Sequence, residues 1–167
     1  VVSPEEANQP DFNDRTDLAN KLWNMYNIDD HDMFILISNP ANNGVIVEFA
    51  KKIKEKGRKL IVVTSKAEAE ASVSRHPSGK KLTDYADLIL DNCAPSPDMV
   101  VTLENGQKIN QVSTVTGNVI AQMLCAETYR YLTGLGHDCP VLLSANVKGA
   151  DVHNREISDV YLGRWNS

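Results

Sequence analysis

Apolar residues recur at two different spacings along this chain, and together these spacings predict strand–helix units. Residues 33–37 and 59–64 contain continuous apolar runs, which are typical of strands buried on both faces of a parallel sheet. Between them, apolar residues such as Ile46 and Phe49 recur at helical spacing across residues 44–56. This order predicts a right-handed βαβ crossover.

The rest of the chain continues this pattern. We predict a helix from Thr16, strands at 88–90, 100–103 and 141–143, a hairpin turn at 104–107, and a long helix at 113–135. The predicted fold class is α/β: a three-layer α/β/α sandwich, flavodoxin- or Rossmann-like, with a mostly parallel sheet of about five strands. Residues 1–13 lack periodicity and are predicted to be an irregular arm before a single domain at 14–167. The long helix is apolar on more than one face, so a homodimer contact is expected on its second side.

Composition and charge narrow the range of functions. The 167 residues are 42% hydrophobic and 23% charged, which fits one compact domain, and the net charge of -5 argues against nucleic acid as a partner. Apolar runs of only strand length predict no membrane span. Three cysteines without a CxxC pair predict reduced thiols and a cytoplasmic location. Neither a nucleotide-binding glycine motif nor metal-ligand spacing is present, so we expect no cofactor and no metal.

Hydroxyl and amide side chains gather where predicted strands end and helices begin. The candidates for phosphate binding are Ser38, Asn39, Asn43, Ser65, Ser113 and Thr114. In an open parallel sheet, ligands bind beyond the carboxyl ends of the strands, where helix N-termini favour anions. The alternative for each residue is helix capping, because Ser, Thr and Asn are also the most common capping residues.

Three residues are candidates for acid–base chemistry. Glu127 lies on an apolar helical stripe, so it is either a partly buried carboxylate suited to proton transfer or a paired structural acid. His153 lies in a polar segment and either reaches a neighbouring site or is solvated. Glu48 either orients the loop after the first strand or is a surface residue.

Several segments resemble the SIS (sugar isomerase) phosphosugar-binding proteins, and more narrowly the UPF0309 subgroup. They are Ser74–Leu82 followed by Tyr85–Asp87 and Asp91–Cys93, then Ser113–Gly117, Ser144–Val147 and His153–Asn154. The resemblance implies an SIS-like domain that binds a sugar phosphate. It also implies aldose–ketose isomerisation through an enediolate, in which a carboxylate moves the C1/C2 proton and a histidine assists ring opening.

The chain departs from the subgroup at the loop after the first strand. Members usually carry Ser-Asn-Ser-Gly-Arg-Asn, whereas residues 38–43 read Ser-Asn-Pro-Ala-Asn-Asn. Pro40 removes a hydroxyl and an N–H, Ala41 cannot take the positive φ of glycine cheaply, and Asn42 replaces a cation. The family's opening helix and strand also have no counterpart here, so the sequence is either a piece of a longer chain or a shortened version. The alternative function is therefore a non-catalytic phosphosugar sensor or an inactive dimeric remnant.

Overall fold

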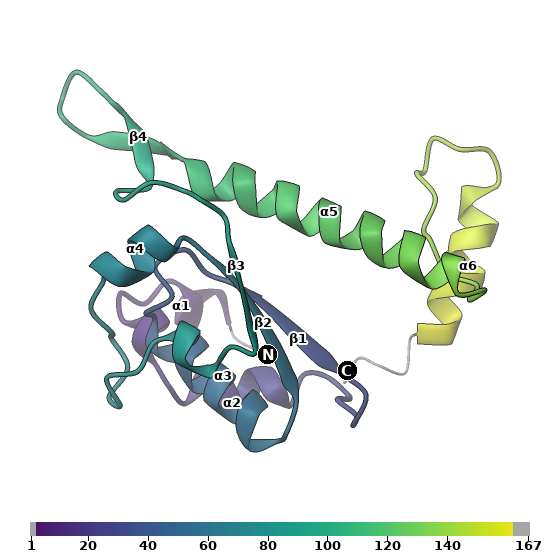
Figure 1. The fold of residues 1–167 in the computed structure, drawn as a ribbon, viewed down its shortest axis with the longest axis horizontal. Coiled ribbons are helices and arrows are strands. Elements are labelled where there is room, and N and C mark those ends of the chain that lie inside the picture. Colours follow the sequence, from purple (N-terminus) through teal and green to yellow (C-terminus); the bar gives the residue numbers. More distant parts are fainter. Residues whose placement is uncertain (1–2, 162–167) are drawn as a thin grey trace.

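A three-stranded parallel sheet forms the centre of the molecule in the computed structural model, which describes residues 3–161 (Figure 1). Its strands are β1 (Met33–Ile37), β2 (Lys59–Thr64) and β3 (Leu88–Asp91), in the order β1-β2-β3. Ile35 pairs with Ile61, and Val62 pairs with Ile89. In the central strand β2, Leu60 and residues 62–64 are buried and Ile61 is partly buried, as its apolar run predicted.

Two helices, α2 (Leu18–Trp23) and α3 (Gly44–Glu55), cover one face of the sheet. The apolar stripe of α3 packs on the strands because its i, i+3, i+4 positions all face the sheet. Helix α3 ends before Gly57, which adopts a φ of 70° that favours glycine. The buried core cluster lies in this layer: Ala19, Ala41, Val47, Phe49, Ala50, Ile53, Leu60, Val62, Ala69 and Leu82.

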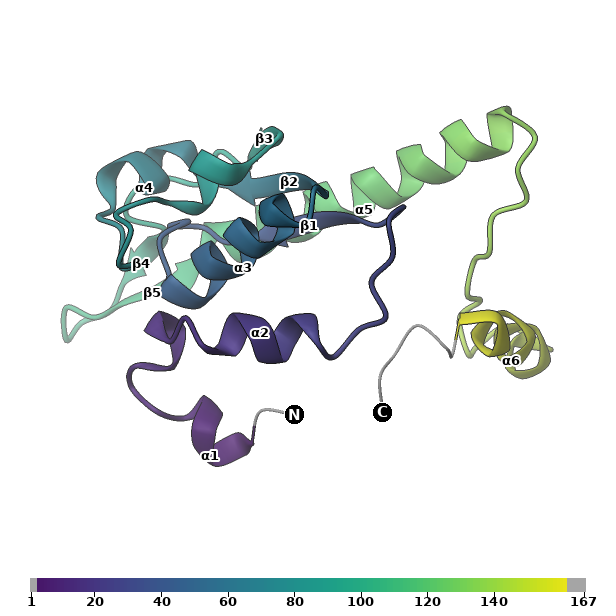
Figure 2. The same ribbon diagram turned by 90° about the horizontal axis from the view of Figure 1, so that it is seen from below.

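Helix α5 (Val112–Gly134) crosses the opposite face of the sheet (Figure 2). Its Gly117 is buried, and a Cβ there would lie 3.7 Å from the Ile37 side chain. The outward side chains of β1 stay exposed, with Ile35 at 45%. The three layers and the α/β class are therefore confirmed, but this second helical layer is packed much more loosely than the first.

The strands differ in arrangement from the expected five-stranded sheet. The predicted turn at 104–107 joins β4 (Met99–Thr102) to β5 (Lys108–Gln111) as an antiparallel hairpin separate from the main sheet. Residues 141–143 form no strand, because the Leu143 backbone bonds to the Asn154 side chain through both its N–H and its carbonyl, each at 2.8 Å. Asn154 belongs to α6 (Ala150–Tyr161), a helix that the periodicity did not predict.

The N-terminal arm is more regular than its composition suggested. In this arm α1 (Pro4–Ala7) is helical, since proline is favoured at the first helical position, and the 3₁₀ turn η1 (Phe12–Asp14) begins at its end. The remaining short elements are α4 (Lys66–Ala71) and η2 (Leu82–Tyr85). Between residues 3 and 161, no helix combines the length and the apolarity needed to cross a membrane.

The layer between α3 and the sheet should dominate stability. Leu60→Ala removes a fully buried side chain from β2, so it should lower the free energy of unfolding by about 2–5 kcal/mol in urea titrations. Leu142→Ala is the matched control, because Leu142 is 62% exposed and its loss should cost less than about 0.5 kcal/mol. Equal losses in the two variants would contradict this description of the core.

Candidate functional site

Asn39 connects the carboxyl ends of all three parallel strands. The Thr64 hydroxyl at the end of β2 donates to the Asn39 carbonyl at 2.8 Å. The Asn92 amide, just after β3, donates to Asn39 Oδ1 at 3.0 Å. Thr64 is fully buried and Asn92 is 4% exposed, so this network lies in the interior and holds the first loop against the sheet edge.

The orientation of the Asn39 side chain follows from its neighbours. The Ala94 N–H donates to Asn92 Oδ1 at 2.9 Å, which leaves the Asn92 amide nitrogen as a donor and requires Oδ1 of Asn39 as its acceptor. Asn39 Nδ2 is then a buried donor with no partner among the residues that the structure describes. Such a group costs about 1–3 kcal/mol if it stays unsatisfied, so an acceptor that reached this atom would be favoured.

Segment 72–82 runs along the loop that follows Asn39 and hydrogen-bonds to it. The Ser72 hydroxyl donates to the Pro40 carbonyl at 2.9 Å, and the Leu82 N–H donates to the Ala41 carbonyl at 2.8 Å. Ala41 has a φ of 52° and is fully buried. Ala41 therefore adopts the left-handed conformation that alanine disfavours, and the contacts from Ser72 and Leu82 hold it there.

Arg75 places a cation at the start of α3. Its Nη2 donates to Asn43 Oδ1 at 2.9 Å, and its Nε lies 2.8 Å from Asp14 Oδ1. Asn43 is the N-cap residue of α3, but its side chain accepts from Arg75 and makes no capping hydrogen bond to the helix. The positive charge absent from position 42 is thus supplied beside this loop by a residue 33 positions further along the chain.

The Glu48 carboxylate accepts hydrogen bonds from Lys51 and His76. Lys51 Nζ lies 3.0 Å from Glu48 Oε1, and His76 Nε2 lies 2.7 Å from Glu48 Oε2. The Ser78 N–H donates to His76 Nδ1 at 3.1 Å, so in the neutral ring Nε2 carries the proton and donates to Glu48. Burial acts to raise the pKa of Glu48, but the hydrogen bonds from Lys51 and His76 outweigh it, so this pKa lies below 4.5.

Two of the six phosphate candidates act as structural groups at helix starts. Ser65 is fully buried, accepts from the Glu68 N–H at 3.1 Å and donates to the Ala94 carbonyl at 2.6 Å. Ser113 donates to the Asp98 carboxylate through its N–H at 2.8 Å and its hydroxyl at 2.5 Å. Both hydroxyls are therefore engaged: Ser65 caps α4, whereas Ser113 makes no cap and binds Asp98, which already places an anion at the start of α5.

Ser38 and Thr114 differ from these two. The Ser38 N–H extends the ladder between β1 and β2 by donating to the Val63 carbonyl at 3.0 Å. Ser38 is half-buried at the end of β1, whereas Thr114 is exposed on the first turn of α5. Ser38, Asn39 and Asn43 are therefore the candidates that the structure brings together in one loop.

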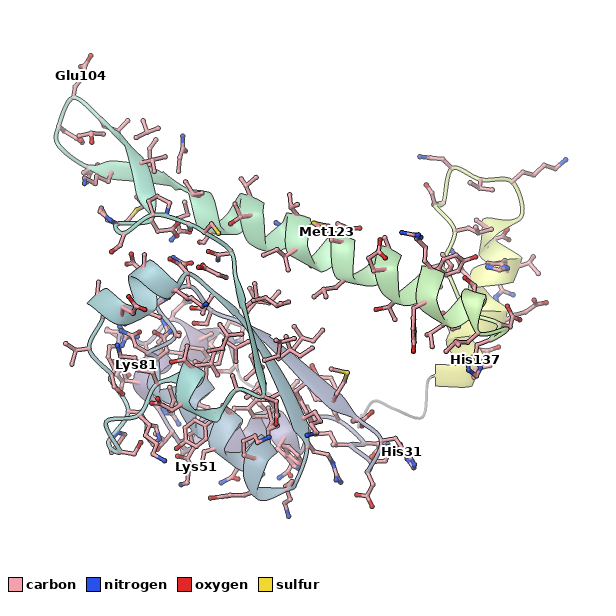
Figure 3. All side chains as sticks on the ribbon, viewed as in Figure 1. His31, Lys51, Lys81, Glu104, Met123 and His137 are labelled. Atoms are coloured by element: carbon pink, nitrogen blue, oxygen red, sulfur yellow. The ribbon has the colours of Figure 1, made fainter. Side chains whose placement is uncertain are left out.

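Glu127 is exposed, contrary to the expected partial burial. Its side chain is 67% exposed and pairs with Arg130 at 2.8 Å, one helical turn away. It lines a groove of about 380 Å³ between β3 and α5, whose other lining residues are mainly apolar: Ile89, Leu90, Asp91, Ile120, Met123 and Leu124. Figure 3 shows Met123 about midway along α5.

His153 lies far from the carboxyl ends of the strands within its own chain. It belongs to α6, which lies at the opposite end of α5 from α4 and the hairpin in both ribbon views. Its Nε2 is 2.9 Å from the Val141 carbonyl, so the imidazole braces the segment before α6. Figure 3 shows the same separation between Glu104 at the hairpin tip and His137 beyond α5.

Sequence reasoning missed three residues of this site: Asn92, Arg75 and His76. Each belongs to a motif that carried the family resemblance, but a motif does not say which loop its side chains contact. A polar residue directly after a buried strand, as Asn92 follows β3, was the available signal. Among residues 3–161, no three His, Cys, Asp or Glu side chains gather closely enough to hold a metal ion.

Comparison with known proteins finds a family match over the βαβ unit that contains this loop. Residues 2–65, which include β1, α3 and β2, match the SIS domain, a phosphosugar-binding class of α/β domain. A UPF0309 protein of Halalkalibacterium halodurans is 35% identical over 163 residues, covering 96% of this chain and 67% of that protein. A UPF0309 protein of Caldanaerobacter subterraneus is 34% identical over 146 residues, or 86% of this chain and 59% of its own length.

The chain therefore contains an SIS domain and belongs to the UPF0309 family. A third relative, a UPF0309 protein of Listeria monocytogenes serotype 4b, is 37% identical over 131 residues, which cover 78% of this chain and 53% of that protein. The chain thus spans between 53% and 67% of the length of these three relatives.

The Glu48 carboxylate should stabilise the fold in a pH-dependent way. Because its pKa is lower in the folded protein than in the unfolded chain, the stabilisation is present above pH 4.5 and is lost as the pH falls through the folded-state value. Glu48→Gln should lower the free energy of unfolding by about 1–2 kcal/mol at pH 7, and the difference from wild type should shrink in urea titrations below pH 4.5.

Glu104→Gln, at the exposed hairpin tip, is the control for loss of one surface carboxylate and should stay within about 0.5 kcal/mol of wild type at pH 7. A Glu48→Gln deficit that is constant between pH 7 and the acid range would mean that packing, rather than charge, is lost.

Proposed function

We propose that this chain binds a sugar phosphate at the carboxyl ends of β1, β2 and β3, and that it belongs to a sugar-phosphate isomerase of the aldose–ketose type. The observation that carries the proposal is the buried, unpartnered Asn39 Nδ2 in a loop between a parallel strand and a helix N-terminus. The SIS domain match over the same residues supports it.

The phosphate would be held mainly by donors of the first loop. Ser38 offers a hydroxyl and Asn39 an amide N–H, while Asn43 precedes the N–H groups of the first turn of α3. These groups favour a phosphate because helix N-termini carry partial positive charge and unpaired N–H groups. Ser65 and Ser113 are better explained as supports of the surrounding helices, since their hydroxyls already have partners, and Thr114 is exposed on the first turn of α5.

Isomerisation needs a carboxylate that removes a proton from C1 or C2 and returns it to the neighbouring carbon. Of the three candidates, Glu48 lies on α3 near the phosphate loop and keeps a lowered pKa, so it is ionised at neutral pH. Glu127 lines the groove beside β3, and His153 lies on α6. In the proposed reaction Glu48 is the base closest to the loop in the fold, whereas the other two need a further chain segment or subunit to join it.

A non-catalytic phosphosugar sensor is the second candidate function. The separation of Glu127 and His153 from the Asn39 loop favours it, because binding requires the loop alone whereas turnover requires acid and base together. A sensor would bind the sugar phosphate without exchanging its C2 proton with solvent.

Self-association accompanies both proposals. Helix α5 exposes a line of apolar side chains, with Val115 at 65%, Val119 at 52% and Met123 at 61% exposure. A second copy of the chain would cover this line, since extended apolar surface is costly in water. The cytoplasmic location inferred from the cysteines stays a prediction; Cys93, Cys125 and Cys139 form no disulfide.

Thermal unfolding against hexose, heptose and amino-sugar phosphates tests the proposal. A ligand at about 100 times its Kd should stabilise the native state by about 2.7 kcal/mol and raise the melting temperature, and the unphosphorylated sugar should not. Asn39→Ala should abolish the rise, whereas Asn118→Ala, an exposed asparagine on α5, should preserve it. No rise with any phosphate would overturn the proposal.

Transfer of deuterium from solvent to C1 or C2 of the bound sugar then separates the two candidate functions. Exchange that is lost in Glu48→Gln while the thermal shift remains would support the isomerase. Binding with no exchange would instead support the sensor.

A further inference from the structure

We propose that Arg75 is the anion-binding cation of loop 38–43 and that the Asp14 carboxylate competes with a bound phosphate for it. This inference rests on the proposed function, which it deepens by naming the residue that would neutralise the phosphate of the sugar and a second residue that opposes its binding.

Arg75 is held beside the loop by backbone and side-chain contacts. Its N–H donates to the Asn42 carbonyl at 3.0 Å, and its Nη2 donates to Asn43 Oδ1 at 2.9 Å. The side chain is 45% exposed, so the guanidinium is reachable from solvent. A guanidinium has five N–H donors in a planar fork that matches the oxygens of a phosphate, and the contacts to Asn43 and Asp14 engage Nη2 and Nε.

The groups around Arg75 are donors that a phosphate could use. Asn43, as N-cap of the 12-residue helix α3, makes no side-chain cap because its oxygen accepts from Arg75. The first N–H groups of the helix therefore lack that cap. Independently, the buried Asn39 Nδ2 has no acceptor within the described part of the chain. An anion at Arg75 would meet a guanidinium beside the start of α3, in the same loop that contains Asn39.

An anion from the chain itself already lies at Arg75. Asp14 Oδ1 is 2.8 Å from Arg75 Nε, and the Asp14 side chain is 42% exposed. The backbone of Asp14 packs on the first residue of α3, where a Cβ on Gly44 would lie only 2.5 Å from the Asp14 carbonyl oxygen. Glycine at position 44 thus permits η1 to lie against the helix start, which brings the Asp14 carboxylate to the cation.

Charge decides which anion Arg75 prefers. A phosphate monoester carries about 1.5–2 negative charges at pH 7, whereas the Asp14 carboxylate carries one. The ester also offers three oxygens to the neighbouring donors. Phosphate binding would therefore replace the contact between Arg75 and Asp14. Because that ion pair must break, it would lower the affinity for phosphate by the strength of an exposed salt bridge.

Titration calorimetry of inorganic phosphate and of each sugar phosphate in the panel tests this with the full chain. Asp14→Asn should bind phosphate up to about fivefold more tightly than wild type, because an exposed ion pair contributes up to this factor. Arg75→Gln should bind at least about tenfold more weakly, and Arg75→Lys should lie between it and wild type. Thermal unfolding without ligand verifies that each variant is folded.

Asp17→Asn is the matched control, since Asp17 forms a similar ion pair with Arg15 only three residues from Asp14. It should bind phosphate as wild type does. Unchanged affinity in both Asp14→Asn and Arg75→Gln would overturn the inference, as would an equal gain in Asp17→Asn.

The outcomes also separate this inference from the proposed function. One outcome is that the expected affinity changes in the Arg75 and Asp14 variants are seen with inorganic phosphate while no sugar phosphate binds more tightly than phosphate itself. That result would support the anion site and overturn the sugar-phosphate proposal. Sugar phosphates that bind tightly to wild type and equally to both variants would do the reverse. Absence of binding for every anion and variant would overturn both.

Discussion

Segment 72–82 is hydrogen-bonded along loop 40–43, and the geometry of the candidate site depends on this contact. Alanine in a left-handed conformation costs about 1–2 kcal/mol, so Ala41 would relax if the loop were released. The bonds from Ser72 and Leu82 to this loop offset that cost, each contributing about 1 kcal/mol. The same segment carries Arg75 to Asn43 and His76 to Glu48, so one loop–loop contact positions both the cation and the carboxylate.

The two faces of the sheet differ in how closely they are packed. The face under α3 is closely packed, and side chains such as Ile53 and Leu60 are fully buried there. This packing holds β1, α3 and the loop between them in a fixed relation, which the proposed anion site in that loop requires. The face under α5 is thinly covered, with Gly117 as the only buried residue of that helix.

Phosphate binding and proton transfer have different structural requirements in this domain. The proposed phosphate site uses Asn39, Asn43 and the start of α3, which all belong to one βαβ unit. Proton transfer needs a base and an acid at adjacent carbons of the sugar, and His153 lies at the other end of α5 from that unit. The local unit is therefore sufficient for the proposed binding, whereas catalysis would depend on how α5 and α6 are placed against further protein surface.

Periodicity identified α3 and β2 because each buries side chains at a spacing that backbone geometry sets, and the apolar runs of β1 and α5 located those elements although their side chains are less buried. It also located the hairpin turn at 104–107, because asparagine and glycine there suit a tight turn. It could not decide that Leu143 bonds to Asn154 and that residues 141–143 stay outside the sheet, since an apolar run is compatible with either arrangement.

The amino-acid sequence on its own specified the α/β class, the βαβ unit and the loop of Ser38, Asn39 and Asn43, because local spacing and strand ends carry that information. Tertiary structure alone decided that Ser65 and Ser113 support helices, that Glu127 is exposed, and that Arg75 meets Asn43. These outcomes depend on contacts between residues far apart in the chain, and a hydroxyl or a charge has no preference among its possible partners until packing brings one of them within hydrogen-bond distance.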